Sequence, residues 1–145
     1  NIKINSEVNS VAICIRFYEE SSNPLSHSDP NELPKTVGDF NKVISIFESK
    51  LNKPYFFIFV QEENDFTNKL VFNSPYEFVT HKKGFLGSWS RLHSQSLCNN
   101  HIFNNSTFYF WGAFFSEINQ NKTKYVYMSN NFLFKKIYNP AWHTF

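Results

Sequence analysis

The sequence predicts an α/β fold with a mostly parallel sheet and helices on both of its faces. Apolar runs rich in β-branched and aromatic residues predict a buried strand at 11–17 and a short strand at 101–103, and the run at 55–60 is typical of a strand that is covered on both faces. Segments with helical spacing of apolar residues lie between and after them. Strands that alternate with helices form parallel sheets of the Rossmann-like type, whose ligands bind beyond the carboxyl ends of the strands. Because a chain of 145 residues supports one core, we expect a single domain over residues 1–145.

The first predicted strand, at residues 11–17, ends in a long polar loop. Polar, Pro-containing sequence follows it as far as Pro34. The next element is a helix in which apolar residues recur at helical spacing from Val37 to Leu51, behind Thr36 as the expected N-cap. Further strands are predicted at residues 55–60, 77–80, 101–103 and 125–128, further helices at residues 87–97 and from Ser106 onwards, and an aromatic tail at residues 137–142.

Composition and spacing exclude several classes of protein. A net charge of +2 with scattered lysines does not predict a nucleic-acid surface. Cys14 and Cys98 have no second cysteine nearby, so we expect both to be reduced and buried. The histidines lack metal-ligand spacing, and no Gly-rich phosphate loop is present. No run approaches the roughly 20 apolar residues that span a bilayer, and no signal peptide is recognised, so a cytoplasmic location is expected.

The segment Asn104-Asn-Ser-Thr-Phe stands between a short strand and an apolar helix. A helix N-terminus presents unpaired N–H groups and a positive dipole end, and Ser106 and Thr107 would add hydroxyl donors. The segment therefore predicts either a phosphate-binding site or ordinary capping by Asn105 or Ser106. The aromatic residues that follow, from Phe108 to Phe115, predict a buried helix rather than a surface for stacking sugars.

Arg16 is one of two arginines in the chain and falls near the carboxyl end of an apolar run. A guanidinium in a strand is costly unless it is paired, and its fork of donors suits a phosphate. The alternative is an ion pair with one of the nearby acidic residues, which are Glu19, Glu20, Glu62 and Glu63. Those carboxylates are also candidates for a general base, although acidic runs after strands are usually solvated.

The longest motif in the chain is S-L-C-N-N-H-I-F-N-N-S-T-F-Y-F-W-G-A, from Ser96 to Ala113. It resembles the α-1,2-fucosyltransferase segment that reads approximately S-L-C-K-H-N-I-I-A-N-S-T-F-S-W-W-G-A. Residues 11–20 resemble the family's H-x-R-R-x-D motif, residues 55–63 its strand ending in S-D-D, and residues 137–142 its closing P-x-x-W element. The resemblance thus covers nearly the whole chain.

The resemblance implies a role for individual residues. In the H-x-R-R-x-D motif Cys14 stands at the histidine, Arg16 at the first arginine, Phe17 at the second and Glu19 at the aspartate, and only Arg16 matches by identity. Arg91 stands near the position where the family carries an acidic residue. The implied catalytic residue is Arg16, which would stabilise departing GDP. The implied donor-binding residues are Cys14, Arg16, Glu19, Asn105, Ser106, Thr107 and Phe108.

The same resemblance implies the carboxyl-terminal, donor-binding half of a GT-B glycosyltransferase, with an acceptor half preceding Asn1. Such an enzyme transfers fucose from GDP-fucose to the 2-hydroxyl of a galactoside glycan, with inversion and without a metal. The expected location is the cytoplasm of a bacterial-type cell, with contact to the inner membrane surface through the other half. Because three positions of the H-x-R-R-x-D motif differ, the alternative is a degenerate nucleotide-sugar-binding module without turnover.

Overall fold

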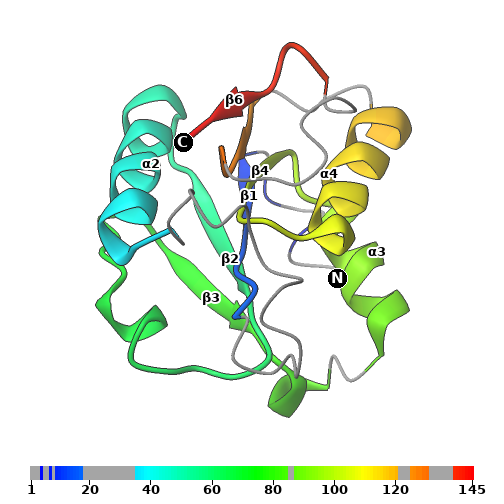
Figure 1. The fold of residues 1–145 in the computed structure, drawn as a ribbon, viewed down its shortest axis with the longest axis horizontal. Coiled ribbons are helices and arrows are strands. Elements are labelled where there is room, and N and C mark those ends of the chain that lie inside the picture. The colour runs from blue at the N-terminus through cyan, green and yellow to red at the C-terminus, as the bar shows by residue number, and fades with distance from the viewer. Residues whose placement is uncertain are drawn as a thin grey trace.

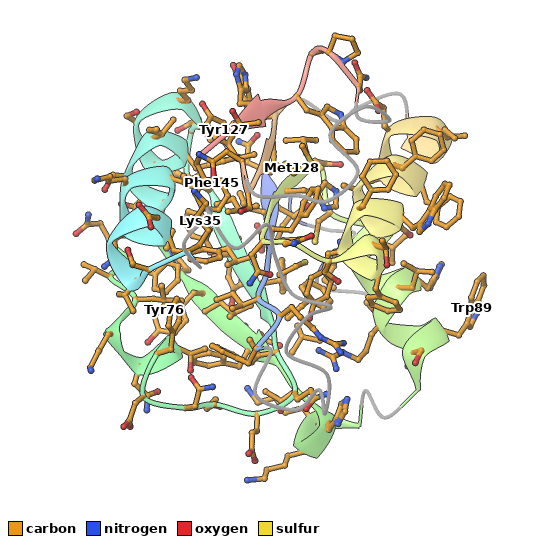
Figure 2. All side chains as sticks on the ribbon, in the orientation of Figure 1. Lys35, Tyr76, Trp89, Tyr127, Met128 and Phe145 are labelled. Atoms are coloured by element: carbon orange, nitrogen blue, oxygen red, sulfur yellow. The ribbon has the colours of Figure 1, made fainter. Side chains whose placement is uncertain are left out.

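The computed structural model describes residues 4, 7, 9–17, 35–84, 87–120, 125–130 and 139–145. They form a single sheet with helices on both faces (Figure 1). The sheet has six strands in the order β3-β2-β1-β4-β5-β6, and every neighbouring pair is parallel. The predicted α/β class and parallel sheet are therefore confirmed. The strands are β1 (Ser10–Cys14), β2 (Tyr55–Phe59), β3 (Tyr76–Val79), β4 (Asn100–Phe103), β5 (Tyr125–Met128) and β6 (His143–Thr144).

The central strands are apolar on both faces because a helical layer covers each side. In β1, Val11 and Ile13 pack with helix α2, whereas Ala12 and Cys14 pack on the opposite side with helix α4. Successive side chains of a strand point to opposite faces, so one strand contributes to both cores. This explains why the run has no polar alternation.

Helix α2 (Val37–Lys50) begins where the sequence predicts. The Thr36 hydroxyl accepts from the backbone N–H of Asp39 at 3.2 Å, and the Thr36 N–H donates to the Asp39 carboxylate at 2.9 Å. This capping box satisfies two donors that the helix itself leaves free. The face of α2 that packs on the sheet carries Phe40, Val43, Ile44 and Phe47.

Helices α3 (Ser88–Ser96) and α4 (Thr107–Gln120) cover the other face and pack against each other. Gly112 makes this close approach possible, because a Cβ there would lie 2.3 Å from the Gln95 side chain. Gln95 is fully buried, and its amide donates to the backbone carbonyl of Tyr109 at 2.9 Å. Two 3₁₀ turns, η3 (Thr67–Lys69) and η4 (His81–Lys83), complete the described elements.

Two expectations from the sequence need correction. The strand expected at residues 11–17 ends at Cys14, because its neighbours β2 and β4 end at the paired positions Phe59 and Phe103. Arg16 therefore lies beyond the strand and is exposed.

The expected burial of the aromatic residues in α4 is only partly correct. Tyr109 and Phe110 are buried, but Trp111 is 45% exposed and Phe115 is 36% exposed. The sheet and α3 cover one side of α4, so a helix that is apolar all round leaves its outer face uncovered. Of the aromatic tail, residues 137 and 138 lie outside the described residues, and Trp142 is buried against Phe103 and Phe110.

Candidate functional site

A pocket of about 180 Å³ lies where the carboxyl ends of the central strands meet. Residues that follow β1, β2, β3 and β4 all contribute to it, as the sequence predicts for a parallel sheet. Helix α2, which follows β1 in the chain, and helix α4, which follows β4, lie on opposite faces of the sheet, so β1 and β4 flank a switch point (Figure 1). Such a switch point is where open parallel sheets bind ligands. The lining residues are Ile15, Arg16, Phe17, Gln61, His81, Ser88, Arg91, Ser106, Phe108 and Tyr109.

Arg16 is held in place by a side chain from the neighbouring strand end. The amide oxygen of Asn104 accepts from the Arg16 N–H at 2.8 Å, and its NH₂ donates to the Arg16 carbonyl at 2.8 Å. The Asn104 side chain thereby supplies the hydrogen-bond partners that the Arg16 backbone would have if β4 continued past Phe103. On the other side, the Tyr109 hydroxyl donates to the carbonyl of Ile15 at 3.3 Å. The backbone around Arg16 is thus fixed to the start of α4.

The guanidinium of Arg16 has no carboxylate partner within the described ranges. Glu62 lies instead 3.8 Å from Lys82, on the surface. Glu19 and Glu20, the other expected partners, lie outside the described residues. The position of Arg16 in the pocket lining agrees with anion binding. The expected ion pair between Arg16 and Glu62 is not formed.

Arg91, the other arginine of the lining, belongs to α3 and is buried. Its Nη1 lies 2.7 Å from Nε2 of His81. Because an arginine side chain only donates, Nε2 of His81 is the acceptor in this contact. From the sequence, Arg91 is notable only because it stands near a position where the resembled family carries an acidic residue. No local pattern in the sequence indicates His81, which is contributed by η4 and comes next to Arg91 only in the folded chain.

Two helices begin at the pocket. Ser88 is the first residue of α3, whose N-cap Gly87 provides no side-chain hydrogen bond, and Ser106 directly precedes α4. The first N–H groups of a helix have no partner within it, and the helix dipole makes this end positive. Both helix starts therefore add to the positive potential of the two arginines.

Three of the residues predicted to bind a nucleotide sugar line this pocket, namely Arg16, Ser106 and Phe108. Asn105 is buried and Thr107 is exposed, and neither belongs to the lining. Asn105 lies in the bend that leads into α4 and has a partner of its own, and Thr107 is the first residue of α4.

Of the other two predicted residues, only Cys14 belongs to the described part of the chain. Cys14 is buried within the sheet, and burial raises the pKa of its thiol well above the ordinary value. Cys98 is also buried and unoxidised, as expected. Glu19 lies outside the described residues.

The chemistry of the lining is that of an anion site. It offers two guanidinium groups, an imidazole, three hydroxyls and an amide, and none of the described lining residues is a carboxylate. In the described part of the chain, His, Cys, Asp and Glu side chains do not gather into a group of three able to hold a metal ion. None of the helices described there is long and apolar enough to cross a membrane.

Comparison with protein-family models, curated proteins and solved structures finds no match to this chain. The likeness to the fucosyltransferases therefore rests on the motifs in the sequence.

Proposed function

We propose that this chain is the donor-binding half of a glycosyltransferase and that it binds GDP-fucose with the diphosphate in the pocket at the carboxyl edge of the sheet. The observation that carries the proposal is that Arg16 and Ser106 line one pocket. They come from two motifs that lie 90 residues apart, and each resembles a donor-binding motif of the same family.

The fold supports the same proposal at a coarser level. The strand order β3-β2-β1-β4-β5-β6 is that of Rossmann-like nucleotide-binding folds, and the pocket lies between β1 and β4 at the switch point. One half of a GT-B enzyme is such a domain, and assignment to that class is part of the proposal. Fold alone does not specify a reaction, so the proposed activity depends on the residues of the pocket.

In the proposed reaction, a 2-hydroxyl oxygen of a galactoside attacks C1 of fucose from the side opposite the diphosphate. The bond from C1 to the β-phosphate oxygen breaks, and GDP leaves with that electron pair. Negative charge then grows on the β-phosphate, where the Arg16 guanidinium and the start of α4 stabilise it. The hydroxyl proton passes to a general base that the proposal does not assign to a residue, and no metal takes part in the scheme.

A second candidate is a module that binds the nucleotide sugar without turnover. The position of Cys14 favours it, because this residue replaces the histidine of the family motif and its side chain is buried in the sheet. A thiol there cannot reach a ligand in the pocket. Nucleotide binding would survive in such a module, since Arg16 and the α4 start are retained.

Titration calorimetry tests the binding step with GDP, GDP-fucose and UDP-galactose. We expect GDP and GDP-fucose to bind, and the Arg16→Ala variant to lose roughly tenfold or more in affinity, as for a charge-assisted hydrogen bond. The Lys53→Ala variant is the control, because Lys53 is an exposed cation just before the amino end of β2, whereas the pocket lies at the carboxyl end. Absence of heat at millimolar GDP would contradict the proposal.

Turnover separates the two candidates. GDP release from GDP-fucose is followed with lactose as the galactoside acceptor, and the product is identified by mass spectrometry. A fucosylated product supports the enzyme, and binding without product supports the module.

A further inference from the structure

We propose that Arg91 is a second anion-binding residue of the pocket, which makes the pocket selective for a diphosphate over a single phosphate. The inference rests on the site of the proposed function, but it does not depend on the nucleoside or the sugar. The group that the pocket recognises is the diphosphate, and Arg91 is a residue that the motif resemblance does not assign to binding.

The hydrogen bonding of Arg91 is the first argument. The side chain is only 8% exposed, and among the described residues its Nε and Nη2 have no hydrogen-bond partner. The hydrogen-bond partner of Arg91 among the described residues is Nε2 of His81 at 2.7 Å, and this partner carries no negative charge. Buried charges in proteins are paired or bind a charged ligand, because an unpaired one loses its hydration without compensation. A guanidinium with two free donors in a pocket wall therefore points to an anion with at least two oxygens.

The charge of the pocket is the second argument. Arg16 follows β1 and Arg91 belongs to α3, so the guanidinium groups come from different walls of one cavity. The starts of α3 and α4 add two positive dipole ends. The described lining residues include no carboxylate that could neutralise this charge. A ligand with two anionic centres neutralises the charge of two guanidinium groups better than a ligand with one anionic centre.

The size of the pocket is the third argument. A volume of about 180 Å³ is below the roughly 300–1,000 Å³ of pockets that enclose a drug-sized ligand, so it suits phosphate groups rather than a whole nucleotide sugar. The rest of a bound donor would then extend beyond the pocket. His81 fixes one edge of the Arg91 guanidinium and leaves the remaining donors for the ligand.

The experiment compares inorganic pyrophosphate with inorganic phosphate by titration calorimetry at constant pH and ionic strength. We expect wild type to bind pyrophosphate at least tenfold more tightly than phosphate, because a second charge-assisted contact is made. Arg91→Gln should remove that difference while phosphate binding stays within about twofold. The matched control is Lys83→Gln, which removes an exposed charge two residues from His81 and should change neither affinity more than about twofold.

Arg91→Lys keeps the proposal testable if Arg91→Gln does not fold. Lysine retains the charge but not the planar fork, so pyrophosphate affinity should fall several-fold while phosphate affinity is retained. Circular dichroism of each variant shows whether it is folded. Equal affinities of wild type for the two anions, or an unchanged preference in a folded Arg91 variant, would overturn the inference.

The outcomes also distinguish this inference from the proposed function. If pyrophosphate binding depends on Arg91 but GDP binds no more tightly than pyrophosphate, the diphosphate site stands and the GDP-fucose assignment fails. If GDP-fucose binds tightly and Arg91→Gln leaves that affinity unchanged, the assignment stands and Arg91 has only a structural role.

Discussion

His101 lies in β4 without contact to solvent, and its replacement should remove a large pH dependence of stability. Its Nε2 donates to the carbonyl of Cys98 at 3.1 Å, and Nδ1 is buried without a partner in the described part of the chain. Burial lowers the pKa of His101 from 6.5 to about 4, and the hydrogen bond to Cys98 opposes the shift only in part. Protonation would create a buried charge and an N–H without an acceptor.

The sign of the effect follows from this lowered pKa. Above pH 6.5 the imidazole is neutral in both the folded and the unfolded chain, so it contributes no pH dependence. As the pH falls from 6.5 through about 4, the unfolded chain takes up the proton first, and the folded state loses stability. The difference between the two pKa values corresponds to roughly 3 kcal/mol, most of which is lost by pH 4.5.

The assay is urea denaturation of wild type and His101→Gln at pH 7.5 and pH 4.5. Other groups titrate equally in both proteins, so the contribution of His101 is the difference between the stability that each protein loses from pH 7.5 to pH 4.5. We expect wild type to lose about 2.5 kcal/mol more free energy of unfolding than His101→Gln. His93→Gln is the matched control, since His93 is an exposed histidine on α3, and it should lose as much stability as wild type. An equal loss in His101→Gln and wild type would refute the reasoning.

Three further substitutions test contacts that position the pocket and the helices. Asn104→Ala removes both hydrogen bonds to the Arg16 backbone, so chemical denaturation should show a loss of about 1–3 kcal/mol and calorimetry weaker pyrophosphate binding. Unchanged binding would mean that Arg16 needs no such support. Gly112→Ala places a Cβ against the buried Gln95 side chain, and despite a helix-propensity gain of about 1 kcal/mol we expect a net loss of about 1–2 kcal/mol in thermal unfolding. A stabilised variant would show that α3 and α4 can move apart. Thr36→Ala removes the side-chain cap of α2 and should lower the free energy of unfolding by about 1 kcal/mol, whereas Thr36→Ser should restore most of it.

Local patterns were sufficient for most of the elements. The cap at Thr36 and the apolar spacing behind it specify α2, because both signals act within a few residues of the chain. β5 has the predicted bounds, Tyr125–Met128, and the apolar runs predicted β1 as a buried strand and β2 as a strand with both faces covered. β6 was not predicted, since two residues are too short to show a period.

The pocket could be predicted only in part. The parallel arrangement implied that the ends of the central strands meet, and Arg16 and Ser106 do line one pocket. Their adjacency depends on β1 and β4 being neighbours in the sheet, and only the structure shows that pairing. Whether either residue binds a nucleotide sugar stays a prediction.

By itself the sequence determined the α/β class, the capped helix α2 and the convergence of the central strand ends, because these depend on short-range periodicity and on the geometry of parallel strands. Only the tertiary structure decided where β1 ends and which side of α4 is uncovered, because both depend on neighbouring elements. It also decided that Arg91 meets His81 in a pocket wall. The two residues are ten positions apart on different elements, and no local pattern records a hydrogen bond that forms only when those elements pack together.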